Sequence, residues 1–225
     1  MSRNGFIAKF LRFIGIVLMA LTSGFTLLGG IGTFCAAIFP QKYESMAGLI
    51  PFQWLYILFM LGATAIGVWG IWATIKLIKG TSDSYLMSIQ ALVAGAALGG
   101  FHIYASRMLR GKSMPVDAVV YMTVMTLIVF LLFKIPFIWQ GVDFTKGNAK
   151  ENKMAGSTAA ILLGLLTFTI QYTMASTHTW DGVNYANAFN TSMTILGWGL
   201  TLGGALIMLV REKVWETEDR LQVRA

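Results

Sequence analysis

Apolar residues occur in six long runs separated by short polar segments. The runs cover residues 13–39, 51–75, 84–106, 118–142, 154–180 and 182–210. The chain has 17 Lys and Arg and 10 Asp and Glu residues, and of these only Lys134 lies inside a run. A helix needs about 20 apolar residues to cross the hydrocarbon core of a bilayer, and each run supplies them. The pattern predicts an all-α, polytopic integral membrane protein, a bundle of six transmembrane helices.

Prolines and charged residues mark the expected helix ends. Pro40 ends the first helix because proline cannot continue the hydrogen-bond ladder, and Pro51 suits the first turn of the second. The chain then divides into a basic amphipathic lead-in over 1–12, a membrane domain over 13–210 and a charged cytoplasmic tail over 211–225. We expect the lead-in to lie on the membrane surface. The predicted spans are about 13–39, 51–75, 84–106, 118–139, 155–175 and 188–210.

The basic residues predict how the helices are oriented. With a cytoplasmic N-terminus and six crossings, 13 of the 17 Lys and Arg residues fall on the inner side and four on the outer side. This agrees with the positive-inside rule and places both termini in the cytoplasm. Five crossings are the alternative, with 84–106 re-entrant. That arrangement would move the basic residues of 134–153 and of the tail outside, so six crossings fit better.

Composition excludes a soluble domain of any size. Charged residues make up 12% of the chain and hydrophobic residues 56%, whereas soluble domains have about 25% charged residues. The net charge of +7 follows mainly from orientation and from contact with anionic headgroups on the cytoplasmic side, so nucleic acid is not needed to explain it. Cys35 is the single cysteine, which rules out a disulfide within the chain.

Small residues recur at the spacing that lets transmembrane helices approach closely. The chain has 24 glycines, most of them inside the apolar runs. Four-residue spacing of this kind serves helix packing in lipid, either within one bundle or against another subunit. Packing within the bundle is the simpler interpretation, and a docking face for a partner is the alternative. The pairs are Gly95 with Gly99, Gly199 with Gly203, and Ala160 with Gly164.

Lysine and tryptophan at the span ends are expected to anchor the protein at the two membrane interfaces. Lys134 lies about one turn from the inner end of the fourth span, where its long side chain can reach the headgroups. Tryptophan is enriched at headgroup level for the same reason. The predicted interface anchors are Lys76, Lys79, Lys134, Trp139 and Trp180.

The sequence has no recognisable catalytic motif, and it predicts a protein that is not an enzyme. It lacks His-Glu-x-x-His, Gly-x-Ser-x-Gly and Cys-x-x-Cys. Ion-coupled transporters and proton pumps usually hold an acidic side chain at mid-membrane, and the six runs contain none. This weighs against those classes but leaves a pathway for a neutral solute open. No cofactor is required by any motif.

One group of potential ligands does collect at the outer ends of the predicted spans. Imidazole, thiolate and carboxylate groups bind zinc or copper, and two histidines can ligate haem iron. The simpler interpretation is structural, with His102 hydrogen-bonded across the hairpin and Arg107 or Arg110 paired with the acid at 117. The residues of this candidate metal or haem site are His102, His178, Cys35, Asp117 and Asp181.

Three functions therefore remain open. We expect an accessory, assembly or scaffold subunit that binds other membrane helices or forms a homo-oligomer in the plasma membrane of a bacterium. The first alternative is a small permease or channel for a neutral or apolar solute. The second is a haem- or metal-binding redox protein. The permease predicts one continuous interior path lined by Gln90, Thr123, Thr126, Thr169 and Gln171.

Overall fold

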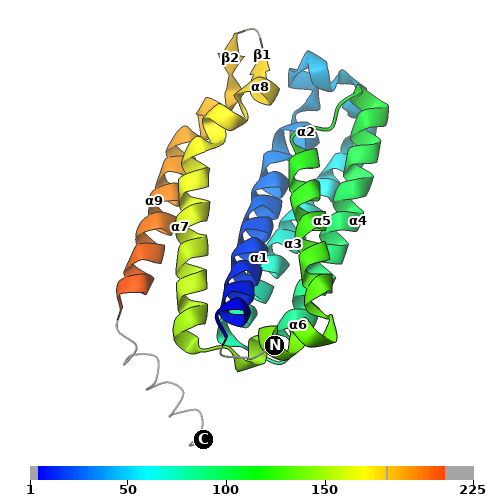
Figure 1. The fold of residues 1–225 in the computed structure, drawn as a ribbon. Helices are drawn as coiled ribbons and strands as arrows, with labels where there is room; N and C mark the ends of the chain where they lie inside the picture. Colours follow the sequence, from blue (N-terminus) through cyan, green and yellow to red (C-terminus); the bar gives the residue numbers. More distant parts are fainter. Residues whose placement is uncertain (1–4, 181, 211–225) are drawn as a thin grey trace, which may run out of the picture.

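The computed structural model describes residues 5–180 and 182–210, without the side chains of Ser45, Lys146, Thr177 and Trp180. Nearly all of this part of the chain is helical (Figure 1). Its α-helices are α1 (Phe6–Gly32), α2 (Phe34–Ile38), α3 (Gln53–Lys79), α4 (Ser84–Arg110), α5 (Val116–Phe133), α6 (Pro136–Val142), α7 (Ala149–Thr173), α8 (Ala175–His178) and α9 (Asn190–Leu209). Short 3-10 helices are η1 (Pro40–Lys42), η2 (Glu44–Phe52), η3 (Phe144–Lys146) and η4 (Tyr185–Phe189). Strands β1 (Thr179–Trp180) and β2 (Val183–Asn184) form an antiparallel hairpin.

Within residues 5–180 and 182–210, six helical segments are long and apolar enough to cross a membrane, which confirms the predicted fold class. The protein is an all-α, multi-pass membrane protein. The segments are Phe6–Ile38, Met46–Lys79, Ser84–Arg110, Val116–Phe133, Ala149–Thr173 and Tyr185–Leu209.

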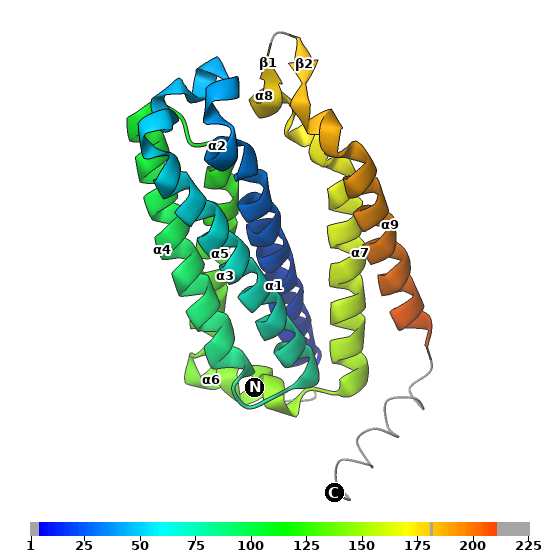
Figure 2. The same cartoon turned by 180° about the vertical axis from the view of Figure 1, so that it is seen from behind.

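The helices form two groups. α1 packs against α3 and α5, α3 packs against α4, and α4 against α5, so these four helices form a closed bundle. α7 and α9 form a separate helical hairpin that joins the bundle through contacts of α7 with α1 (Figure 2). The start of α1 and the end of α9 lie at the same end of the molecule, opposite the β-hairpin. We call these the N-terminal end and the β-hairpin end.

Two spans are interrupted where the sequence predicts continuous helices. The helix of the first span breaks at Thr33, whose hydroxyl donates to the carbonyl of Gly29, and resumes as α2. The fourth span ends at Phe133, and α6 starts only at Pro136. The residue before a proline is disfavoured in helical geometry, and Ile135 accordingly has an extended ψ of 126°.

The predicted lead-in is not a separate surface element in the described part of the chain. α1 begins at Phe6, so residues 6–12 are its first two turns, and Arg12 is buried. The helix of the first span therefore begins before residue 13. Arg12 can be buried in it because its guanidinium has the polar partners described below. The predicted charged tail over 211–225 lies outside the described residues.

Glycine ends two of the long helices. Gly80 follows α3 with φ 69° and Gly111 follows α4 with φ 71°, the left-handed geometry that glycine adopts without steric cost. In the turn after α3, Asp83 accepts hydrogen bonds from Lys76 and Thr81. The sequence "KGTSDS" therefore forms a tight turn between α3 and α4.

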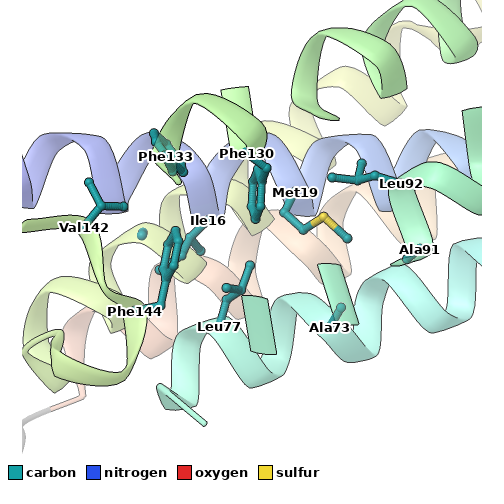
Figure 3. Close-up of a cluster of buried hydrophobic side chains, with 11 residues drawn as sticks. Ile16, Met19, Ala73, Leu77, Ala91, Leu92, Phe130, Phe133, Val142 and Phe144 are labelled. Carbon is teal, nitrogen blue, oxygen red and sulfur yellow. The ribbon is translucent and has the colours of Figure 1, made fainter. Parts of the chain in front are cut away.

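The larger of the two clusters of buried hydrophobic residues lies in the half of the bundle nearer the N-terminal end. Phe130 and Phe133 of α5 meet Phe144 of η3, while Ile16 and Met19 of α1 fill the space between them and Leu77 (Figure 3). Each of these side chains is almost completely buried. The cluster closes the bundle at this end.

Candidate functional site

The predicted outer ligands His102 and Asp117 occupy neighbouring helices but have different partners. His102 stacks on Phe59, with ring centroids 4.3 Å apart, and meets the edge of Tyr56. Asp117, in the first turn of α5, is 4% exposed and accepts a hydrogen bond from Arg107. The ion pair between Arg107 and Asp117 is therefore the structural arrangement that the sequence allowed as the simpler alternative.

Cys35 and His178 lie elsewhere at the β-hairpin end. Cys35 contacts Tyr43, and the Tyr43 ring meets Tyr185 edge-on at 5.4 Å. Burial, followed by the neighbouring Cys35 and Tyr185, raises the pKa of Tyr43. His178 Nδ1 lies 3.1 Å from the carbonyl oxygen of Met174.

The structure does not assemble the predicted metal or haem site from the residues that it describes. No three His, Cys, Asp or Glu side chains in residues 5–180 and 182–210 come together in a way that could hold a metal ion. Asp181, the fifth predicted ligand, lies outside the described residues. Burial lowers the pKa of His178, aided by the charge of Arg110, so this imidazole is neutral at neutral pH.

The predicted solute path is also not formed. Thr126 is buried and shares a hydrogen bond of 2.8 Å with Thr22, and Thr123 is buried one turn away. Gln90 and Thr169, by contrast, are exposed on the outside of their helices, and Gln171 is on the α7–α9 hairpin. The five side chains therefore lie on separate surfaces.

The three small-residue pairs have different roles. A Cβ on Gly99 would lie 2.4 Å from Val120, and one on Gly164 would lie 2.4 Å from Thr201, so both glycines sit where helices meet. Gly199 and Gly203 differ, because a Cβ at either position would meet nothing within 4 Å in the described structure. Both face away from α7, which α9 contacts through Gly197 and Gly204 instead.

The predicted interface anchors lie at the ends of the spans. Lys76 pairs with Asp83, and Lys79 is exposed in the last turn of α3. Lys134 lies directly after α5, with its ammonium 4.1 Å from the ring centre of Trp139 and 4.7 Å from that of Tyr85. Trp180 belongs to β1, but its side chain is not among those described.

A partly buried charge cluster at the N-terminal end was not predicted from the sequence. Arg12 is 3% exposed, and its guanidinium donates to the Gly141 carbonyl at 2.6 Å and to Glu151 at 3.1 Å. Lys9 pairs with the same carboxylate at 2.8 Å. Glu151 is in the first turn of α7, so the cluster ties α7 to α1 and α6. The available signal was that Lys9 and Arg12 are three positions apart, which puts both on one helix face.

A small cavity lies inside the four-helix bundle, nearer the β-hairpin end. It has a volume of about 40 Å³. Its walls come from α1, α3, α4 and α5 and include His102 as the only titratable side chain among the described lining residues. Thr123 lines it too, and the hydrogen-bonded pair of Thr22 and Thr126 lies about one turn further in.

Comparison with models of protein families, with curated proteins and with solved structures finds no match for this chain. The function must therefore be argued from the geometry alone.

Proposed function

We propose that this protein is a non-enzymatic scaffold or assembly subunit of the plasma membrane that associates with another copy of itself through α9. The observation that carries this proposal is the outward face of α9. Within the described structure α9 packs extensively only against α7 and the preceding η4. Its opposite side presents Gly199 and Gly203, which nothing in the described chain covers.

Glycine is expensive in an exposed helix, by about 1 kcal/mol relative to alanine. At several other positions in the spans, glycine lies where helices meet. A Cβ on Gly30, Gly67 or Gly70 would lie within 2.6 Å of a neighbouring helix. Gly32 and Gly100 are also open, but they lie on different helices and form no pair. The open pair on α9 therefore supports close approach by a helix from outside this chain.

The shape of this face favours a second copy as the occupant. Leu196 and Leu206 are exposed and lie at helical spacing from Gly199 and Gly203, so one face carries both a groove and the large side chains that could fill it. Such a face is complementary to itself about a twofold axis, which is the geometry of an isologous contact. Because no charged residue lies in α9, an apolar helix suits it better than a polar one.

Association in lipid bilayers tests the proposal. The wild-type chain, reconstituted at varied protein-to-lipid ratios, should be dimeric at ratios where the double variant Gly199→Ile with Gly203→Ile is monomeric, with at least tenfold weaker association. Gly100→Ile is the matched control, since it fills another open glycine on a span and should leave the dimer intact. A wild-type chain that stays monomeric at every ratio would overturn the proposal. So would a monomer that binds only some other membrane protein.

The orientation and the membrane belong to the same proposal. The turn between α3 and α4 and the segment of α6 and η3 lie at the N-terminal end with the start of α1, which carries Lys9 and Arg12 (Figure 1). The 3-10 helix η1, which carries Lys42, and the turn between α4 and α5 lie at the β-hairpin end. The basic excess supports a cytoplasmic N-terminal end in a bacterial plasma membrane. Reporter fusions at Lys112 and Gly182 should both report the outer side, and a cytoplasmic report from either would contradict the orientation.

A further inference from the structure

The break between α5 and α6 places one lysine at the edge of the membrane. α5 has 18 residues and is therefore about 27 Å long, close to the thickness of the hydrocarbon core. Lys134 directly follows it, and α6 begins at Pro136. The turn between the two helices lies at the N-terminal end (Figure 1), and the Lys134 side chain is exposed. The ammonium group is thus carried to the boundary between hydrocarbon and headgroups.

Two aromatic rings from different helices hold this ammonium in place. It lies 4.1 Å from the ring centre of Trp139 on α6 and 4.7 Å from that of Tyr85 on α4. The rings meet edge-on, with their centroids 4.7 Å apart. Tyr85 is itself fixed, because its hydroxyl donates to the Phe130 carbonyl at 2.6 Å and its ring stacks on Phe130. Lys134 is therefore oriented before any ligand binds, which lowers the entropy that binding costs.

Lys134 differs from other lysines at this end in having no acidic partner. Lys76 pairs with Asp83, and Lys9 pairs with Glu151. In the part of the chain that the structure describes, no carboxylate lies within ion-pair distance of Lys134. An ammonium has three hydrogen-bond donors, and ring faces offer no oxygen to accept them. The donors of Lys134 are thus available to an anionic oxygen from outside the chain.

The surface next to Lys134 on the membrane side is apolar. Leu131 lies three positions before Lys134 on α5, and Ile89 lies four positions after Tyr85 on α4. Residues at this spacing share a helix face, so both lie nearer the middle of the bilayer than the ammonium does. Leu131 is exposed and Ile89 is half-buried, and α4 packs against α5. A cation above an apolar surface matches a phosphate that carries acyl chains.

We propose that Lys134, Tyr85 and Trp139 form a binding site for one anionic phospholipid. The phosphate accepts hydrogen bonds from the Lys134 ammonium, and an acyl chain lies along Leu131 and Ile89. Zwitterionic lipids carry a cation of their own beside the phosphate, so the site favours lipids with a net negative charge. The site lies on α4, α5 and α6 and does not depend on the association through α9.

Native mass spectrometry of the full chain tests the site. The protein is released from nanodiscs that contain equal amounts of phosphatidylglycerol and phosphatidylcholine with the same acyl chains. The wild type should retain more phosphatidylglycerol, and Lys134→Gln should lower the ratio of the two bound lipids about fivefold, the contribution of one lysine near an anionic surface. Lys79→Gln removes another exposed lysine at the same end and should leave the ratio unchanged. Equal ratios in the two variants would overturn the proposal and show a general attraction by positive charge.

The aromatic rings require a separate test. Trp139→Leu leaves the charge but frees the lysine, so the lipid ratio should fall about threefold, and Trp139→Phe, which keeps a ring, should restore most of it. An unchanged ratio in Trp139→Leu would overturn a site built on the rings. If that variant fails to fold, the comparison of Lys134→Gln with Lys79→Gln still decides.

Competition distinguishes a lipid from a soluble phosphate. Glycerol 3-phosphate has the phosphate without acyl chains, and a large excess of it should leave the bound phosphatidylglycerol in place. Displacement of the lipid from the wild type, but not from Lys134→Gln, would overturn the proposal and make a soluble phosphate the ligand.

Discussion

The four-helix bundle and the α7–α9 hairpin differ in how much of each helix is buried and in which side chains make the helix contacts. In the apolar stretch of the first span, 44% of the residues are buried, whereas the figure is 11% for the span that contains α9. The bundle surrounds a large aromatic cluster, while the hairpin is held by small residues along a single helix contact. Lipid supplies no hydrophobic drive between helices, so packing quality decides how strongly each part holds together.

The hairpin depends on the bundle at two places, one at each end. At the N-terminal end, Glu151 of α7 accepts from Arg12 and pairs with Lys9 of α1. At the β-hairpin end, Tyr185 contacts Tyr43 of the bundle side. Between these ends α7 lies against α1 and α9 does not. The hairpin is thus an arm attached to the bundle, and its free helix is the one with the open glycine pair.

The largest expected effect is on the aromatic cluster. Phe130→Ala should lower the free energy of unfolding by about 3 kcal/mol, because the cavity left among Phe133, Phe144 and Ile16 cannot collapse. Leu206→Ala removes an exposed side chain of α9 and should change the stability of the monomer by less than about 0.5 kcal/mol. Unfolding in mixed micelles measures both. Equal losses would show that the two regions are packed alike.

Glu151→Gln should have the next largest effect, and it should act on the attachment of the arm. It leaves Arg12 buried with one charge partner fewer. The loss should be about 2 kcal/mol, below the 3–5 kcal/mol typical of a fully buried pair, because Glu151 is 22% exposed. Proteolysis within 143–148 should accelerate while the amides of α4 and α5 keep their protection from exchange. Lys150→Gln, at the second residue of α7, is the control. Uniform loss of protection in both regions would contradict a separable arm.

Gly164→Ala should separate α7 from α9 at a smaller cost. The new methyl group would lie 2.4 Å from Thr201 and 2.7 Å from the Gly197 carbonyl, so the helices must move apart. Overpacking of this kind costs about 1–3 kcal/mol. A spin-label pair across α7 and α9 should report a longer distance in Gly164→Ala than in the wild type. Gly199→Ala is the control and should leave the distance unchanged, because its methyl group would have no neighbour within 4 Å. An unchanged distance in Gly164→Ala would place the helix contact elsewhere.

Sequence reasoning worked where one pattern determines the structure. Long runs with almost no charge are typical of membrane spans, so the six spans follow from the hydrophobic pattern alone. The break at Pro136 is local too, but its consequence is not, since α6 brings the Gly141 carbonyl to Arg12. That pairing joins residues 129 positions apart. A basic residue near the start of a span is equally compatible with a headgroup anchor.

The candidate site was less predictable, because the spacing of residues along the chain does not determine how each helix is rotated about its own axis. His102, Asp117, Cys35 and His178 share an outer level by topology, but each helix turns its side chain towards a different neighbour. The same limit applies to Gly199 and Gly203, which have the same spacing as Gly95 and Gly99. Gly95 and Gly99 face a neighbouring helix, whereas Gly199 and Gly203 face away from α7. Only packing reveals which glycine pair is covered.

The smallest expected effect concerns acid at the β-hairpin end. Burial of His178 lowers its pKa below the ordinary value of 6.5, so the folded state favours the neutral ring. The stability that this ring contributes is complete above pH 6.5 and is lost as the pH falls from 6.5 towards the lower folded-state pKa. After correction for the intrinsic pH dependence of exchange, the amides of α8 and η4 should therefore be less protected at pH 5 than at pH 7.5. The protection of the α5 amides should not change. His178→Gln can still donate to the Met174 carbonyl but cannot titrate in this range, and it should abolish the effect. If the glutamine variant kept the same pH response, a group other than His178 would be responsible for the loss of protection in the arm at low pH.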